Sequence, residues 1–119
     1  MRSMKSSFLT IDGHACGIRV STAASMRDRM RGLLGHKRLA TDEALLLVPC
    51  RSVHTFGMGF PIDVLFIDRQ WHVVAIHRCV PQARMLFCLG AKRTLEMSAG
   101  MADVLSIKTG SCIGLEVYA

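Results

Sequence analysis

Three titratable side chains in the sequence are of types that could carry acid–base or metal chemistry: His54, Asp63 and Glu96. An imidazole suits proton transfer near neutral pH, and two carboxylates beside it would be enough for general acid–base or metal-assisted catalysis if all three groups converged. His54 could equally be a loop histidine whose hydrogen bonds go to backbone. The sequence does not show whether the three converge, so a hydrolase or lyase using them is an alternative and no catalytic residue is assigned.

Asp63 is the most informative of the three residues because it lies in an apolar segment, Ile62 to Asp68, that is expected to form a strand. The alternation of a strand places Asp63 on one face with Leu65 and Ile67. Burial of an unpaired carboxylate costs several kcal/mol, so a cation or several N–H donors are expected as its partners.

Arg29 is the best candidate for such a cation. Apolar residues at helical spacing predict a helix over residues 22–34, and Arg29 stands at the edge of the apolar side of that helix. Its guanidinium could make two hydrogen bonds to a carboxylate. Two interpretations stay open: a structural ion pair that ties helix to strand, or a ligand pocket that contains both Arg29 and Asp63.

The stretch from His54 to Phe60 alternates two glycines with Phe56, Met58 and Phe60. Such a stretch could form the lip of a pocket or an exposed docking patch, and it could equally be a tight crossing in the core. The first of these interpretations predicts a shallow pocket. Its candidate residues are Arg29, His54, Phe56, Met58, Asp63 and Glu96.

Short alternating or apolar segments separated by turn residues dominate the remainder of the chain, which favours a mainly β sandwich or small barrel. We predict one domain over residues 1–119, with the helix near residues 22–34 and a second short helix near residues 100–107. Residues 79–92 are expected to be a long loop or a weak edge strand. The predicted strands cover residues 8–12, 15–20, 44–48, 62–68, 71–77, 93–98 and 113–117.

Composition limits the cofactors that we expect. The five cysteines include no Cys-x-x-Cys pair, so they are expected to be reduced and mostly buried. His14 with Cys16, and His77 with Cys79, could supply zinc ligands, but their spacing is unlike that of ordinary zinc sites. We therefore predict neither a metal nor another cofactor.

Charge and the N-terminal sequence limit the partners. A formal charge of +6 favours an anionic partner, but the basic residues lack the interleaved aromatic residues of a site that stacks nucleic-acid bases. An anionic small molecule or a protein segment is therefore the expected partner.

The N-terminus has no apolar run long enough for a signal peptide or a membrane span, so a cytoplasmic location is expected.

Three ordered motifs resemble one known family. They are Arg29-Met-Arg-Gly-Leu-Leu34, His54-Thr-Phe-Gly-Met-Gly-Phe-Pro-Ile-Asp-Val-Leu-Phe-Ile-Asp68 and Leu95-Glu-Met-Ser-Ala-Gly100. Together they are similar to the domain-of-unknown-function 192 family over about residues 22–117. The chain departs from the family at Gly59, where relatives often carry a basic residue, and at Ser98, where they often carry proline.

The resemblance implies a mainly β fold with a helical excursion after the first strands, and it implies no established activity. A non-enzymatic binding or accessory domain is favoured, because the sequence contains no complete catalytic set. The predicted pocket near His54 to Phe60 would take an anionic small molecule or a partner segment. Besides the enzyme, the other alternative is a protein-interaction module that uses an open sheet edge.

Overall fold

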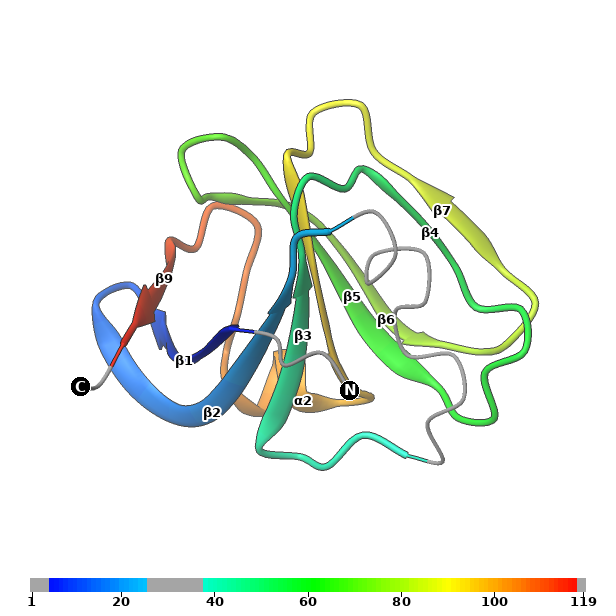
Figure 1. Ribbon diagram of the computed structural model, residues 1–119, viewed down its shortest axis with the longest axis horizontal. Coiled ribbons are helices and arrows are strands. Elements are labelled where there is room, and N and C mark those ends of the chain that lie inside the picture. The colour runs from blue at the N-terminus through cyan, green and yellow to red at the C-terminus, as the bar shows by residue number, and fades with distance from the viewer. Residues whose placement is uncertain (1–4, 26–37, 118–119) are drawn as a thin grey trace.

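The computed structural model describes residues 5–25 and 38–117, which form a mainly β structure as predicted (Figure 1). In these residues one short helix accompanies nine strands. In chain order the elements are β1 (Lys5–Ile11), β2 (His14–Ala23), β3 (Glu43–Leu47), β4 (Ser52–His54), β5 (Ile62–Ile67), β6 (Val73–Val80), β7 (Met85–Phe87), β8 (Arg93–Ser98), α2 (Met101–Val104) and β9 (Ile113–Glu116).

Seven of the strands form one curled sheet in the order β6-β5-β8-β3-β2-β1-β9, in which β2 and β3 run parallel and the other neighbours antiparallel. The two outer strands of the sheet approach each other at one end. There the Val73 N–H donates to the Ser111 carbonyl (2.9 Å), and the Ile113 N–H donates to the Trp71 carbonyl (2.8 Å). The sheet is therefore a half-barrel, whose edges meet at one end.

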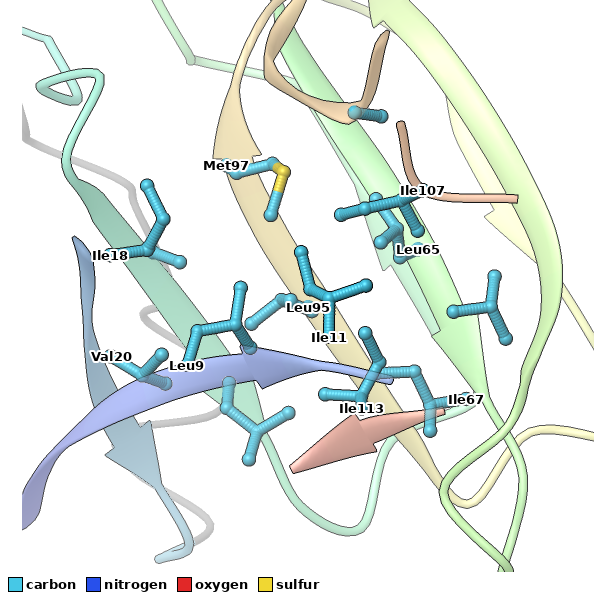
Figure 2. Packing of buried hydrophobic residues seen from close by; sticks show 14 residues of the cluster. Leu9, Ile11, Ile18, Val20, Leu65, Ile67, Leu95, Met97, Ile107 and Ile113 are labelled. Carbon is cyan, nitrogen blue, oxygen red and sulfur yellow. The ribbon is translucent and has the colours of Figure 1, made fainter. Parts of the chain in front are cut away.

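The concave face of the sheet holds a first apolar core. Figure 2 shows side chains of β1, β5, β8 and β9 pointing into one space. Since this core draws on strands that are far apart in the sheet, curling is what allows it to close. Its buried members are Leu9, Ile11, Ile18, Val20, Ala44, Leu46, Leu65, Ile67, Val73, Leu95, Met97, Ala102, Ile107 and Ile113.

A second apolar core lies on the opposite face of the same sheet. The small sheet formed by β4 and β7 packs here, because its inward side chains Val53 and Leu86 lie against the cluster that contains Val64 and Phe66. Strand β5 is therefore covered on both faces, and all six of its residues are buried. The apolar run in the sequence between Ile62 and Ile67 reflects this double cover.

Most predicted elements are present, with some differences. Thr22 and Ala23, expected to begin a helix, instead end strand β2, because Ala23 lies in register with Leu47 of β3. Residues 26–34 of the predicted helix, and with them Arg29, lie outside the described residues. The second predicted helix is present as α2.

Candidate functional site

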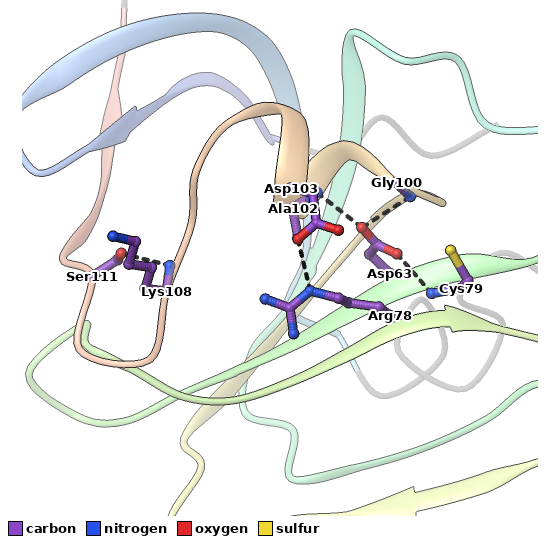
Figure 3. Close-up of polar contacts among 8 residues, drawn as sticks. All are labelled: Asp63, Arg78, Cys79, Gly100, Ala102, Asp103, Lys108 and Ser111. Carbon is purple, nitrogen blue, oxygen red and sulfur yellow. Dashed lines mark hydrogen bonds and ion pairs between the residues drawn. The ribbon is translucent and has the colours of Figure 1, made fainter.

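Asp63 is completely buried and accepts three hydrogen bonds from backbone N–H groups (Figure 3). One carboxylate oxygen accepts from Cys79 (2.8 Å), and the other accepts from Gly100 (3.1 Å) and Ala102 (2.8 Å). The expectation of several N–H donors is therefore confirmed. These bonds supply the partners that a buried carboxylate needs.

Two local features of the chain turn those N–H groups toward Asp63. In β6 the pairing jumps from Ile62 opposite Val80 to Val64 opposite His77, which leaves two residues of β6 to face Asp63 in a β-bulge. Cys79, one of the two, has a φ of 50°. After β8, Gly100 has a φ of 93°, a conformation that glycine adopts without strain, and it leads into the first turn of α2, whose N–H groups have no partner within the helix.

Asp63 therefore joins three segments: strand β5, the bulge in β6 and the turn between β8 and α2. Beside it, Arg78 of the bulge forms an ion pair with Asp103 of α2 (Nε to Oδ1, 2.8 Å), with both side chains largely in solvent. The geometry gives the carboxylate a structural role in this corner of the half-barrel.

Glu96 is also buried, but its environment is the reverse of that of Asp63. It lies on β8 directly opposite Val64 and Leu45, on the face of the second core, and only 3% of it is exposed. Its Oε1 atom has no hydrogen-bond partner. Burial raises the pKa of the Glu96 carboxyl to about 7, because the charged form would lose its hydration.

The two carboxylates do not share a site. Asp63 pairs with Met97 and belongs to the face of the first core, whereas Glu96 pairs with Val64 and belongs to the other face. His54 is exposed on β4 and lies beside Phe56, with ring centroids 5.9 Å apart. Asp63 and Glu96 therefore face opposite sides of the large sheet, and His54 lies on the exposed side of the small sheet, so the three residues of the hydrolase or lyase alternative do not converge.

The motif from His54 to Phe60 divides into surface and core. Phe56 is 49% exposed, whereas Met58 is buried in the second core. Gly59 is exposed, and a Cβ atom built there would meet nothing within 4 Å. A Cβ atom at this position would therefore be accommodated without a clash.

Buried Thr55 anchors this loop to the segment that precedes β7. Its hydroxyl donates to the Pro81 carbonyl (2.7 Å) and accepts from the Arg84 N–H (2.9 Å), while its own N–H donates to the Arg84 carbonyl (2.9 Å). The Thr55 carbonyl also accepts from the Ala83 N–H (3.3 Å), so that four hydrogen bonds of one residue join segments that are 26 or more positions apart in the sequence.

The structure also places three exposed residues that were not candidates from the sequence, Met85, Phe87 and Leu89, near the candidates His54 and Phe56. Outward positions alternate along the small sheet, so that Ser52 and His54 lie on the same face as Met85 and Phe87. Phe56 lies beside His54 in the turn after β4, and exposed Leu89 follows β7 in the next turn. We call Phe56, Met85, Phe87 and Leu89 the apolar stripe; their exposed fractions are 49%, 77%, 63% and 72%. One sequence signal could have indicated this exposed face. It is the alternation of Met85, Phe87 and Leu89 with Leu86 and Cys88, which are partly buried against the second core.

Within residues 5–25 and 38–117, no three His, Cys, Asp or Glu side chains are grouped so that they could hold a metal ion. The same part of the chain contains no helix of the length and apolar character needed to cross a membrane.

Comparison with known families identifies the class of protein. The model of the DUF192 family, described as "Uncharacterized ACR, COG1430", matches residues 8–115. The chain therefore belongs to the DUF192 family, an uncharacterised family. None of the curated proteins matches the chain.

Two solved structures share the fold. One is a protein from Sinorhizobium meliloti 1021, described provisionally as a transcription regulator, with a TM-score of 0.87, 18% identity and coverage of 97% of each chain. The other is a protein of unknown function from Novosphingobium aromaticivorans DSM 12444, with a TM-score of 0.81 and 19% identity, over 93% of this chain and 84% of that one. At these identities the likeness shows the fold alone.

We expect Asp63→Ala to lower the free energy of unfolding by about 3–5 kcal/mol, because three N–H groups lose a charged acceptor. Asp63→Asn retains one acceptor oxygen, so it should lower the free energy of unfolding by less than Asp63→Ala does. Denaturant unfolding measures both changes, and hydrogen exchange should show faster exchange at Cys79, Gly100 and Ala102. Asp103→Ala, which removes only an exposed ion pair, is the control and should cost less than about 1 kcal/mol. Equal losses for the two alanine variants would contradict the structural role.

Glu96 should make the stability of the protein depend on pH. Its carboxyl has an ordinary pKa of 4.5 and a folded-state pKa of about 7. Between these values the unfolded chain has released the proton that the folded protein keeps. The free energy of unfolding should therefore fall as pH rises from about 4.5 to 7, by an amount on the order of 3 kcal/mol, and then level off.

The measurement is denaturant unfolding at a series of pH values for the wild type and for Glu96→Gln. The variant should lack this part of the pH dependence, because glutamine does not titrate. Glu116→Gln, which changes an exposed glutamate of β9, is the control and should keep the pH dependence of the wild type. A wild-type profile that coincides with that of Glu96→Gln would show that Glu96 is not the titrating group.

Thr55→Val should destabilise the protein by about 1–2 kcal/mol, because it removes the hydroxyl that joins Pro81 and Arg84 while keeping a similar shape. Thr55→Ser keeps the hydroxyl and should retain most of the wild-type stability. Thermal or denaturant unfolding of the two variants provides the comparison. If serine were as damaging as valine, the lost hydrogen bonds would not explain the effect.

Proposed function

We propose that the protein is a non-enzymatic binding domain whose apolar stripe binds a segment of a partner protein. The observation that supports this proposal is the concentration of exposed apolar side chains on the small sheet and in the turns that follow its two strands. Seven large hydrophobic side chains are exposed in the described part of the chain, and four of them form the stripe. Contiguous exposed apolar groups on a folded domain mark interaction sites, whereas single ones are ordinary.

The shape of the stripe favours a polypeptide over a small molecule. Sites for small molecules enclose most of the ligand in a concave pocket. Met85, Phe87 and Leu89 instead stand out from the surface, with 63–77% of each residue exposed. Flat or protruding apolar surfaces of this kind suit an extended chain that lies across them.

The arrangement of the ionisable side chains argues for binding rather than catalysis. Catalysis by His54, Asp63 and Glu96 would require the three groups to meet around a substrate. Asp63 is instead occupied by backbone N–H groups, and Glu96 faces the second core. His54 is left beside the apolar stripe, where it can contribute a polar contact to a partner.

The proposal predicts that Phe87→Ser abolishes retention of a partner polypeptide that the wild-type protein retains. Affinity capture from cell extract with quantitative mass spectrometry would compare the wild type, Phe87→Ser and Val104→Ser. Val104 is a matched control because it is 72% exposed but lies on α2. Neither variant should change the free energy of unfolding by more than about 0.5 kcal/mol, since both alter exposed side chains. A partner lost equally in both variants, or in neither, would count against the apolar stripe as the binding surface.

A further inference from the structure

Resting on the proposed function, we propose that the outer edge of β7 takes an extended, acidic segment of the partner as a third strand of the small sheet. Three features of the structure support it: the direction of the backbone groups in β7, the open position of that strand, and the charge around the small sheet.

The hydrogen-bond pattern shows which backbone groups point outward. The Cys88 N–H donates to the Arg51 carbonyl, and the Thr55 N–H donates to the Arg84 carbonyl, each at 2.9 Å. In an antiparallel pair, hydrogen-bonded positions alternate with positions whose N–H and C=O groups point away from the partner strand. Met85 and Phe87, which lie opposite His54 and Ser52, occupy the second kind of position. Their backbone groups therefore point to the outer edge of β7.

That edge is open in the described part of the chain, where β7 pairs with β4 alone. Figure 1 shows β7 as the outermost ribbon on its side of the molecule. The opposite edge, along β4, is partly used, because the Cys50 thiol lies 3.1 Å from the Ser52 carbonyl oxygen and donates to it. An added strand would therefore find its donors and acceptors at Met85 and Phe87, whose side chains belong to the apolar stripe.

The charge around the small sheet selects an acidic partner. Residues 50–60 and 81–92, which contain β4, β7 and their flanking loops, carry Arg51, Arg84 and Lys92. All three of these side chains are exposed. The same two segments contain no Asp or Glu, although the chain has nine acidic residues in total. A surface with one sign of charge attracts the opposite sign and repels like-charged partners.

An anionic membrane would offer the same combination of negative charge and apolar surface, but it fits the strand edge less well. The outward N–H and C=O groups of Met85 and Phe87 would lose water in a bilayer without gaining hydrogen-bond partners. An extended peptide supplies those partners. Every second side chain of the added strand would lie beside the apolar stripe. The remaining ones would lie on the side that Arg84 shares with Leu86 by alternation, where the exposed Arg84 side chain is their cationic neighbour. The expected segment therefore alternates apolar and acidic residues.

A synthetic peptide in which valine and glutamate alternate is the probe, titrated against the full chain. Binding should slow hydrogen exchange at the amides of Met85 and Phe87. N-methylation of every second residue, in the register that removes the bonds to β7, should weaken binding about tenfold or more. Arg84→Glu should weaken it about fivefold, while Lys108→Glu, a change of an exposed lysine outside the small sheet, should leave it unchanged.

The outcomes separate this inference from the proposed function. If Phe87→Ser abolishes peptide binding but N-methylation does not, the stripe binds partners without strand addition, and the inference fails while the proposed function stands. If Phe87→Ser binds the peptide as tightly as Val104→Ser, the apolar stripe is not the binding surface and both fail. Equal binding of a valine–lysine peptide would overturn the acidic requirement. Binding of anionic phosphatidylserine vesicles together with no peptide binding would overturn the inference in favour of a membrane.

Discussion

The corner where β5, β6 and α2 meet depends on how one buried charge is satisfied. Asp63 lies at 0% exposure in a strand that is covered on both faces, where a carboxylate without partners would cost several kcal/mol. The chain meets this constraint with backbone N–H groups of a bulge and of a helix start, which fixes the positions of β6 and α2 relative to β5. The left-handed backbone at Cys79 and Gly100 follows from the same requirement, because it aims those N–H groups inward.

Glu96 shows the other way in which a folded protein can bury a carboxyl group. Its Oε1 atom has no hydrogen-bond partner, so burial favours the neutral form instead of an ion held by donors. Asp63 and Glu96 occupy neighbouring strands, yet the register places them on opposite faces of the sheet. The two groups therefore act separately: one organises a corner of the half-barrel, and the other is buried in the second core, where desolvation raises its pKa.

The small sheet of β4 and β7 has one side in the second core and one side in solvent. Its inward residues Val53 and Leu86 secure it to the large sheet, while Thr55 ties its connecting loops together. This attachment leaves the outward alternate positions free of any packing role. Large apolar side chains at such positions gain little by folding alone, which is why we propose that they bind a partner.

The sequence by itself determined most strands, because alternation and turn residues are local properties, and it indicated that Asp63 was costly to bury. It also indicated the family, through motifs that are contiguous in the chain. No strand was predicted from the sequence at the position of β4, and the residues of β7 were predicted only as part of a long loop or weak edge strand. Three-residue strands carry too little periodicity to be recognised, and their pairing joins segments about 30 positions apart. Only the tertiary structure decided that backbone N–H groups surround Asp63 and that Glu96 lies on the other face, because register and bulges depend on contacts between distant segments.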